Sequence, residues 1–318
     1  MQTIVFMGSN KSGSSREAIR AAVSLGYLTI LLTNKINLIT KRTEFPDIHI
    51  MNYCDIDDLE SIRVMLRKLS RRAIEITAIV SFIDPYCYTA SVLGDEYSIN
   101  KMSTKAIGLI NDKIASRNVL LGSKYIPWYE SVQSDSTLTE EYLDKKIPFI
   151  IKSPFSSGSK DVHLVKSYDE YLHYKEKIVD NHPGEPLIIE EYLDGPQFLV
   201  ETIVYKNKVN IIAIIEQEIT HINNLFIVTG YDLLTRPDKK FKKKLTKAIE
   251  QILKSHGFEN GPCHLELRYN NENWKLIEIN PRISGSGMNA MIEIGFGINL
   301  VKETWRMKLG AKPNLTNK

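Results

Sequence analysis

The sequence predicts an α/β domain built on a doubly wound parallel sheet, then a small α+β domain, then a domain with an antiparallel sheet. Short apolar strands alternate with helices along the N-terminal part, which is typical of a parallel sheet covered on both faces. Longer strands near the C-terminus alternate apolar and polar residues, which is typical of antiparallel pairing. With 318 residues, 43% hydrophobic and 25% charged, the chain is long enough to bury more than one core.

The first domain is expected to span residues 1–110. Its strands are predicted at 3–7, 28–33, 48–51 and 78–82, and its helices at about 15–25 and 57–72. The first loop, residues 8–14, has the glycine spacing of a phosphate-binding loop, but Ser14 stands where that motif needs lysine. A carboxylate substrate at this helix N-terminus is therefore a better interpretation than a nucleotide.

The second domain is expected to span residues 111–190 and to form a lid. Its predicted elements, in chain order, are a helix at 112–122, strands at 149–152 and 162–165, a helix at 167–179 and a strand at 186–191. The third domain would span residues 191–318. Its predicted antiparallel strands are 197–205, 208–215, 263–268 and 273–280.

Charge and hydropathy exclude several classes of protein. The formal net charge of +3 is too small to indicate nucleic-acid binding, and no run of eighteen apolar residues indicates a membrane span. The chain opens directly on a strand without a basic leader, so a cytoplasmic enzyme is expected. The cysteines Cys54, Cys87 and Cys263 are widely spaced, which indicates buried thiols instead of a disulfide framework or a zinc site.

Polar residues alternate along two neighbouring strands near the C-terminus. Strand alternation puts the members of each strand on one face: His264, Glu266 and Arg268 on the first, and Leu276, Glu278 and Asn280 on the second. Two carboxylates and an amide oxygen suit Mg²⁺, which prefers oxygen ligands and shares them with substrate phosphates. A solvated sheet face is the alternative interpretation of such a pattern.

The residues that follow the second strand favour the metal site. Pro281 ends the pairing between the two strands, and the planar guanidinium of Arg282 can bind phosphate or an oxyanion. The glycine-rich turn 284–287 allows a phosphate or substrate to approach the backbone closely. Asp84, at the end of a predicted strand, could meet an amino group or cap a helix.

Lysines and a connector provide the other parts of a nucleotide site. Lys113 lies in a predicted helix after the first domain, and Lys152 ends an apolar strand before a serine-rich loop whose amides can cover phosphate. The connector 187–196 is an apolar strand that runs into a turn, and it can offer backbone groups to adenine.

Taken in their order along the sequence, these motifs resemble the ATP-grasp superfamily of carboxylate ligases over nearly the whole chain. The segment 261–268 and the strand and loop from 215 to 231 look most like the L-amino-acid, or dipeptide, ligase branch. The resemblance implies the ATP-grasp fold, with ATP and Mg²⁺ as cofactors and Mn²⁺ as a substitute.

The resemblance also implies roles for individual residues. The implied ATP-binding residues are Lys113, Lys152, Ser157, Gly158, Ser159, Glu190, Glu191, Leu193 and Gln197. Among them the two lysines would contact phosphates, Glu190, Glu191 and Leu193 would hold adenine, and Gln197 stands where many relatives carry glutamate for the ribose hydroxyls. The implied metal ligands are Glu266, Glu278 and Asn280, and the implied catalytic residues are Arg282, His264 and Arg268. A structural role for His264 stays open beside a direct one.

The implied reaction joins a carboxylate to an amine through an acyl phosphate, with amino-acid-like small molecules as partners and a homodimer as an option. One alternative is a purine-pathway or carboxylase-type enzyme that activates bicarbonate or formate. The other is a nucleotide-binding regulatory protein without ligase chemistry, which Gln197, the single glycine in the loop 153–161 and the short C-terminal region would suit.

Overall fold

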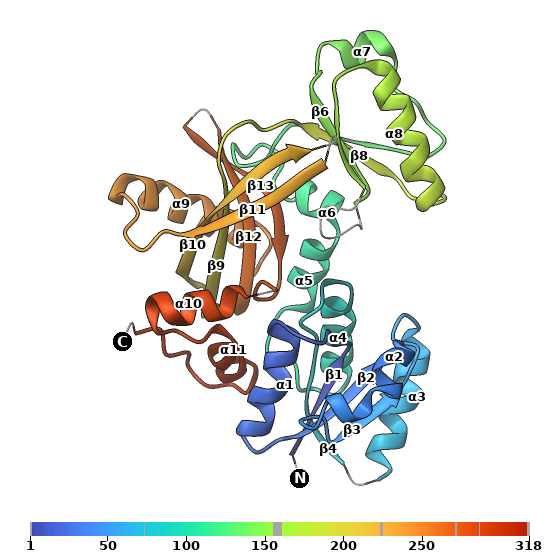
Figure 1. Ribbon diagram of the computed structural model, residues 1–318, viewed down its shortest axis with the longest axis vertical. Coiled ribbons are helices and arrows are strands. Elements are labelled where there is room, and N and C mark those ends of the chain that lie inside the picture. Colours follow the sequence, from blue (N-terminus) through green and yellow to red (C-terminus); the bar gives the residue numbers. More distant parts are fainter. Residues whose placement is uncertain are drawn as a thin grey trace.

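Three sheets make up the fold in the computed structural model, which describes residues 2–72, 74–154, 161–222, 225–270, 272–285 and 287–316. A parallel sheet carries the N-terminus, a small antiparallel sheet with its helices forms a separate lobe, and a larger antiparallel sheet lies beside both (Figure 1). The predicted fold class is therefore confirmed, including the order of the parallel and antiparallel parts.

The parallel sheet has the strand order β3-β2-β1-β4. Its strands are β1 (Gln2–Met7), β2 (Leu28–Thr33), β3 (Ile50–Tyr53) and β4 (Glu75–Val80). The helices of this part of the chain are α1 (Ser14–Ser24), α2 (Ile36–Thr40), α3 (Leu59–Ser70) and α4 (Asp84–Glu96), with a 3₁₀ turn at Arg42–Glu44, and then α5 (Thr104–Asn111), which packs in the core of the large sheet. Alternate residues of β1 enter different cores, Ile4 and Phe6 on one face and Val5 and Met7 on the other. Both faces are thus buried, as a doubly wound sheet requires.

The small sheet has the order β5-β8-β6-β7 and is antiparallel throughout. Its strands are β5 (Tyr129–Val132), β6 (Phe149–Lys152), β7 (Val162–Val165) and β8 (Leu187–Glu191). The helices of this region are α6 (Lys113–Asn118), α7 (Glu140–Asp144) and α8 (Tyr168–Asn181). Tyr171 and Ile178 of α8 pack on Phe149 and Ile151, so one face of the sheet is covered by α8.

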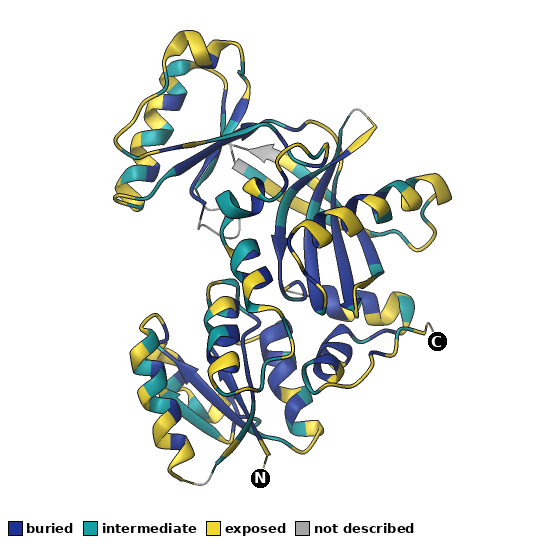
Figure 2. Cartoon of the chain, turned by 180° about the vertical axis from the view of Figure 1, so that it is seen from behind, coloured by how far each residue is buried: buried dark blue, intermediate teal, exposed yellow. Residues whose placement is uncertain are grey.

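The large sheet has the order β11-β10-β9-β12-β13. Its strands are β9 (Gln197–Tyr205), β10 (Lys208–Ile222), β11 (Leu225–Leu233), β12 (Gly261–Asn270) and β13 (Asn273–Asn280). Helix α9 (Lys239–Ser255) covers one face, where Leu245 and Ile249 join the core cluster of Leu265 and Leu267. Figure 2 shows the strands as largely buried and the outer side of α9 as exposed.

The C-terminal helices connect the large sheet with the N-terminal domain. Helices α10 (Met288–Phe296) and α11 (Leu300–Lys308) lie between the two in Figure 1. Trp305 of α11 is fully buried, stands edge-on to Phe6 at 5.7 Å between ring centroids, and donates its indole N–H to the carbonyl of Ala18 at 3.0 Å. One hydrophobic core therefore contains residues from both ends of the chain.

One detail of the predicted alternation is wrong. Leu276 was expected to share a face with Glu278 and Asn280, but it lies in the core cluster together with Ile279. The register between β12 and β13 shifts between Glu266 and Leu267, so β13 carries an extra residue at that point. Such a bulge reverses which side chains point to which face.

No helix in the described part of the chain is both long enough and apolar enough to span a lipid bilayer.

We expect Trp305→Ala to lower the free energy of unfolding by about 3 to 5 kcal/mol, because it removes a fully buried indole from the shared core. Chemical denaturation measures the change. Ile294→Ala, on the neighbouring helix α10 at a side chain that is 88% exposed, is the control and should change stability little. Equal stability of the two variants would contradict the packing described for α11.

Candidate functional site

A cavity of about 400 Å³ lies between the small sheet and the large sheet. Its wall includes residues of the connector after β8, residues of the cleft face of the large sheet, and lysines of α6 and β6. The volume is within the range of small-molecule sites, and the lining combines apolar side chains with a few charged ones. A smaller cavity of about 200 Å³ borders the same Lys113 and Glu278 and extends to Asp84 and Asn280.

A buried carboxylate joins two cations at the centre of this arrangement. Glu190 of β8 is 4% exposed, and its two oxygens accept from the Arg117 Nε at 2.6 Å and the Lys152 Nζ at 2.5 Å. Arg117 of α6 is also buried and donates its second terminal nitrogen to the carbonyl of Ile277 at 2.6 Å. One guanidinium thereby connects α6, the small sheet and the strand that carries Glu278.

The electrostatics of this cluster depend on the pairing. Burial alone would raise the pKa of Glu190, but the positive charges of Arg117 and Lys152 outweigh it and lower the pKa to about 2. Burial lowers the pKa of Lys152 below its ordinary value, and Glu190 opposes that shift. The cluster contains two cations and one anion, so the cavity wall at this point favours an anionic ligand.

Two carboxylates face each other across neighbouring strands of the large sheet. Glu266 of β12 pairs directly with Glu278 of β13, and His264 pairs with Asn280. Burial and the neighbouring Glu266 raise the pKa of Glu278, while Lys113, whose Nζ is 3.5 Å from a Glu278 oxygen, opposes the rise. A divalent cation would relieve the repulsion between these acidic groups.

His264 is held between two acidic side chains. Its Nδ1 lies 2.6 Å from Glu201, which is fully buried, and its Nε2 lies 3.6 Å from Glu266. Burial would lower the pKa of His264, but Glu201 and then Glu266 outweigh that effect and raise it to about 10. The imidazole is therefore a cation at neutral pH, which the contact with Glu201 fixes in orientation.

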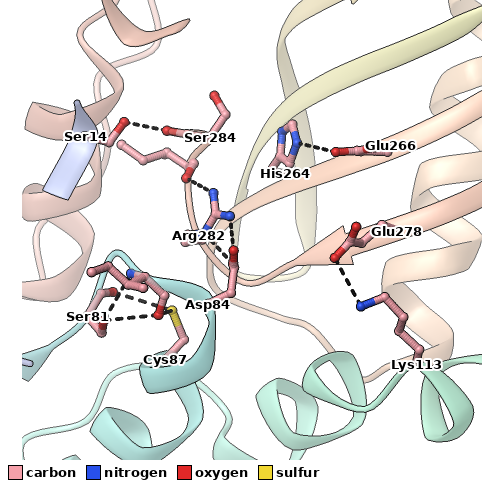
Figure 3. Close-up of polar contacts among 12 residues, drawn as sticks. Ser14, Ser81, Asp84, Cys87, Lys113, His264, Glu266, Glu278, Arg282 and Ser284 are labelled. Carbon is pink, nitrogen blue, oxygen red and sulfur yellow. Dashed lines mark hydrogen bonds and ion pairs between the residues drawn. The ribbon is translucent and has the colours of Figure 1, made fainter. Parts of the chain in front are cut away.

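Arg282 connects the end of the large sheet with helix α4 of the N-terminal domain. Its Nε and one terminal nitrogen donate side-on to the two oxygens of Asp84, and its other terminal nitrogen donates to the carbonyl of Ile283 at 2.8 Å (Figure 3). Burial alone would lower the pKa of Arg282, but Asp84 outweighs it and raises the pKa. Asp84 is the first residue of α4 and makes no side-chain cap there, so of its two expected roles the capping one is not observed.

Arg268 lies beside the connector after β8. It donates one terminal N–H to the carbonyl of Leu193 at 2.6 Å, and its Nε donates to Gln197 at 3.1 Å. Its guanidinium therefore fixes the backbone of the connector, next to Glu191 and Tyr192 in the wall of the larger cavity. The catalytic role implied for Arg268 stays a prediction.

Most of the predicted site residues come together around the two cavities. The residues that line them are Lys113, Lys152, Glu190, Glu191, Leu193, Gln197, Glu266, Arg268, Glu278 and Asn280. The predicted phosphate-loop residues Ser157, Gly158 and Ser159 lie outside the described part of the chain. The individual roles of all these residues stay predictions.

Arg117 and Glu201 were not singled out from the sequence. Arg117 stands four residues after Lys113 in one helix, a spacing that puts both side chains on the same side, and this signal could have identified it. Glu201 is the one carboxylate of β9, and it stands between Val200 and Thr202 in the centre of the strand. A buried charge in such a strand needs a cationic partner, and the facing residue on β12 is His264.

The residues present fit a magnesium ion bound together with a nucleotide. In the described ranges, no three histidine, cysteine or acidic side chains cluster as a complete metal cage. Mg²⁺ is usually bound by one or two carboxylates together with substrate phosphates, so the pair of Glu266 and Glu278 is a sufficient protein contribution. The cations Lys113 and Lys152 line the same cavity and suit the phosphates.

Comparison with known proteins identifies the fold. Residues 145–290 match a family described as the ATP-grasp domain. The crystal structure of an L-amino acid ligase from Bacillus licheniformis has a TM-score of 0.81 to this chain at 16% identity, covering 98% of this chain and 74% of that one. N5-carboxyaminoimidazole synthetase from Staphylococcus aureus, solved with ADP, gives 0.77 at 18% identity, with coverage of 99% and 79%.

The curated sequence relatives are longer than this chain. Over 181 residues the chain is 25% identical to an L-arginine-specific L-amino acid ligase of Bacillus subtilis, which covers 53% of this chain and 42% of that protein. The chain spans between 34% and 55% of the length of the first curated relatives that it matches.

We expect Glu190→Gln to lower the free energy of unfolding at neutral pH by about 3 kcal/mol, because Arg117 and Lys152 would lose their shared anion. The folded-state pKa of Glu190, about 2, is below its ordinary value of 4.5. Its contribution is therefore full above about pH 5 and is lost as the pH falls toward 2. Urea unfolding of both proteins across this range should show the difference between them shrinking with acid.

The control for this experiment is Glu176→Gln, which removes an exposed carboxylate from α8 of the same lobe. Its stability should follow that of the wild type at every pH. A difference between wild type and Glu190→Gln that does not depend on pH would contradict the ionised, paired state of Glu190.

Proposed function

This chain carries an ATP-grasp domain in an ATP-grasp fold, and from that premise we propose that it is an ATP-dependent ligase that joins a carboxylate to an amine. In the proposed reaction, the γ-phosphoryl group of ATP passes to a substrate carboxylate. The amine then attacks the acyl phosphate, which forms an amide and releases phosphate together with ADP.

The observation that carries the proposal is that Asp84 holds Arg282 directly after the predicted metal ligands of β13. Asp84 holds its guanidinium from the side, while Glu278 and Asn280 stand just before it on β13. Asp84 and the carbonyl of Ile283 engage three of the five N–H groups of Arg282, so one N–H on each terminal nitrogen remains for a further oxyanion. A phosphoryl or tetrahedral group beside the carboxylate pair would meet such donors.

The other residues of the cavity would bind different parts of the nucleotide and its metal ion. Lys113 and Lys152 would bind the phosphates, and the connector with Glu191 and Leu193 would hold adenine. Glu266, Glu278 and Asn280 would hold Mg²⁺, which neutralises charge on the transferred phosphoryl group when bound. His264, fixed by Glu201, would orient Glu266 and keep a positive charge beside it.

The smaller cavity supports a small amine or carboxylate as the second substrate. Its volume of about 200 Å³ and its polar wall of Asp84, Asn111, Lys113 and Asn280 suit a compact zwitterion better than a nucleotide. Amino-acid-like substrates are therefore our preferred class, and the two L-amino acid ligases among the relatives agree with this choice. A cytoplasmic location and a homodimer stay predictions.

A second candidate is ligation with bicarbonate as the activated acid. The likeness in fold to a biotin carboxylase domain solved with MgADP, ADP and bicarbonate favours it, although that likeness concerns the fold alone. Release of phosphate that depends on bicarbonate and not on amino acids would select this candidate. Binding of Mg-ATP without phosphate release under any mixture would select a regulatory protein.

We expect Glu278→Gln and Arg282→Ala each to lower the rate of ADP release at least a hundredfold, because oxyanion and metal contacts typically contribute two to three orders of magnitude to turnover. Coupled-enzyme detection of ADP, with Mg-ATP and paired amino acids, measures the rate. Circular dichroism should show that both variants stay folded, with an unfolding midpoint near that of the wild type for Glu278→Gln and a lower one for Arg282→Ala, which leaves Asp84 unpaired.

The matched controls are Glu272→Gln, whose carboxylate is 84% exposed, and Arg306→Ala, whose side chain is 51% exposed. Both should turn over at the wild-type rate. Full activity of Glu278→Gln and Arg282→Ala would exclude the proposed mechanism.

A further inference from the structure

Three side chains form a row across neighbouring strands of the large sheet. Gln217 of β10 is paired in register with Gln197 of β9, and Gln197 is paired with Arg268 of β12. All three line the larger cavity. Hydrogen bonds run along the row, from Arg268 Nε to Gln197 Oε1 at 3.1 Å and from Gln197 Nε2 to Gln217 Oε1 at 2.8 Å.

The chemistry of the neighbours fixes how the amide of Gln197 is turned. A guanidinium can only donate, so the side of Gln197 that faces Arg268 must be its oxygen. In this orientation the Gln197 Nε2 faces Glu266 and donates to its Oε2 at 3.1 Å. The reverse orientation would break the contact with Arg268.

The orientation of Gln197 then determines that of Gln217. The Gln197 Nε2 donates to both Glu266 and Gln217, so both of its N–H groups are engaged. Gln217 must present its oxygen to Gln197, which leaves its own NH₂ group on the other side. Within the described ranges that NH₂ group has no protein acceptor, and the side chain lines the cavity.

The row lies between the two ends of the proposed nucleotide site. Arg268 bonds the carbonyl of Leu193 in the connector, where adenine is expected, and Gln197 bonds Glu266, where the metal and phosphates are expected. A sugar stands between the base and the phosphates of any nucleotide. The side chains of this row therefore face the sugar when a nucleotide fills the cavity.

We propose that Gln217 is the residue that binds a ribose hydroxyl of the nucleotide, and that Gln197 is a positioning residue. This inference rests on the proposed function, because it takes ATP as the occupant of the cavity. Gln197 donates its N–H groups to the oxygen of Gln217 and to one oxygen of Glu266, so it has no N–H group left to donate to the sugar, whereas Gln217 has one. Gln217 donates an N–H to the hydroxyl oxygen and thereby distinguishes ribose from deoxyribose.

The test compares the binding of ADP, 2′-deoxyADP and 3′-deoxyADP in the presence of Mg²⁺, which avoids turnover. Isothermal titration calorimetry on the full chain gives the three dissociation constants for each variant. The wild type should bind ADP about fivefold more tightly than the weaker of the two deoxynucleotides, as expected for one neutral hydrogen bond. Gln217→Met keeps the length of the side chain, has no N–H group, and should lower that ratio to about one.

The control is Gln251→Met, at an exposed position on α9, and it should keep the wild-type ratio. A ratio that is unchanged in Gln217→Met, or lost only in Gln197→Met, would overturn the inference while leaving the nucleotide site in place. No preference for ADP in the wild type would overturn it as well. Failure of the wild type to bind any of the three nucleotides would overturn both the inference and the proposed function.

Discussion

The arrangement of the site depends on one buried carboxylate. Glu190 lies in the strand that leads to the connector, and it is bonded by Lys152 from the neighbouring strand and by Arg117 from α6. Arg117 also bonds the carbonyl of Ile277, next to Glu278. Because an unpaired buried charge is costly, these elements have to keep their relative positions. Charge pairing therefore connects the lobe of the small sheet with strand β13 of the large sheet.

Buried charges are also paired on the face of the large sheet that lines the cavity. Each of the three buried cations there has an acidic or carbonyl partner. His264 is bonded to Glu201, Arg268 to the carbonyl of Leu193, and Arg282 to Asp84. The apolar residues of β12 point the other way, into the core beneath α9. Hydrophobic burial thus fixes the strands, and the paired charges orient the polar side chains that remain for ligands.

Much of this could be predicted from the sequence because strand and helix periodicity and motif order are local signals. The parallel sheet, the antiparallel sheets and the convergence of Glu266, Glu278 and Asn280 follow from them. Other features depend on pairing that periodicity does not encode. The bulge that turns Leu276 into the core, the burial of Arg117 and the packing of Trp305 on the N-terminal domain are set by contacts between distant segments. The amide orientation of Gln197 likewise depends on neighbours from two other strands.

The central claim is that the acid is activated by phosphoryl transfer from ATP before an amine attacks. It is tested most directly with a mixture of amino acids whose carboxyl oxygens carry a heavy isotope, incubated with Mg-ATP and the full chain. An acyl phosphate transfers one carboxyl oxygen to the released phosphate, so mass spectrometry should find labelled phosphate in proportion to the amide product. Amide product accompanied only by unlabelled phosphate, or phosphate release that does not depend on amino acids, would contradict the account.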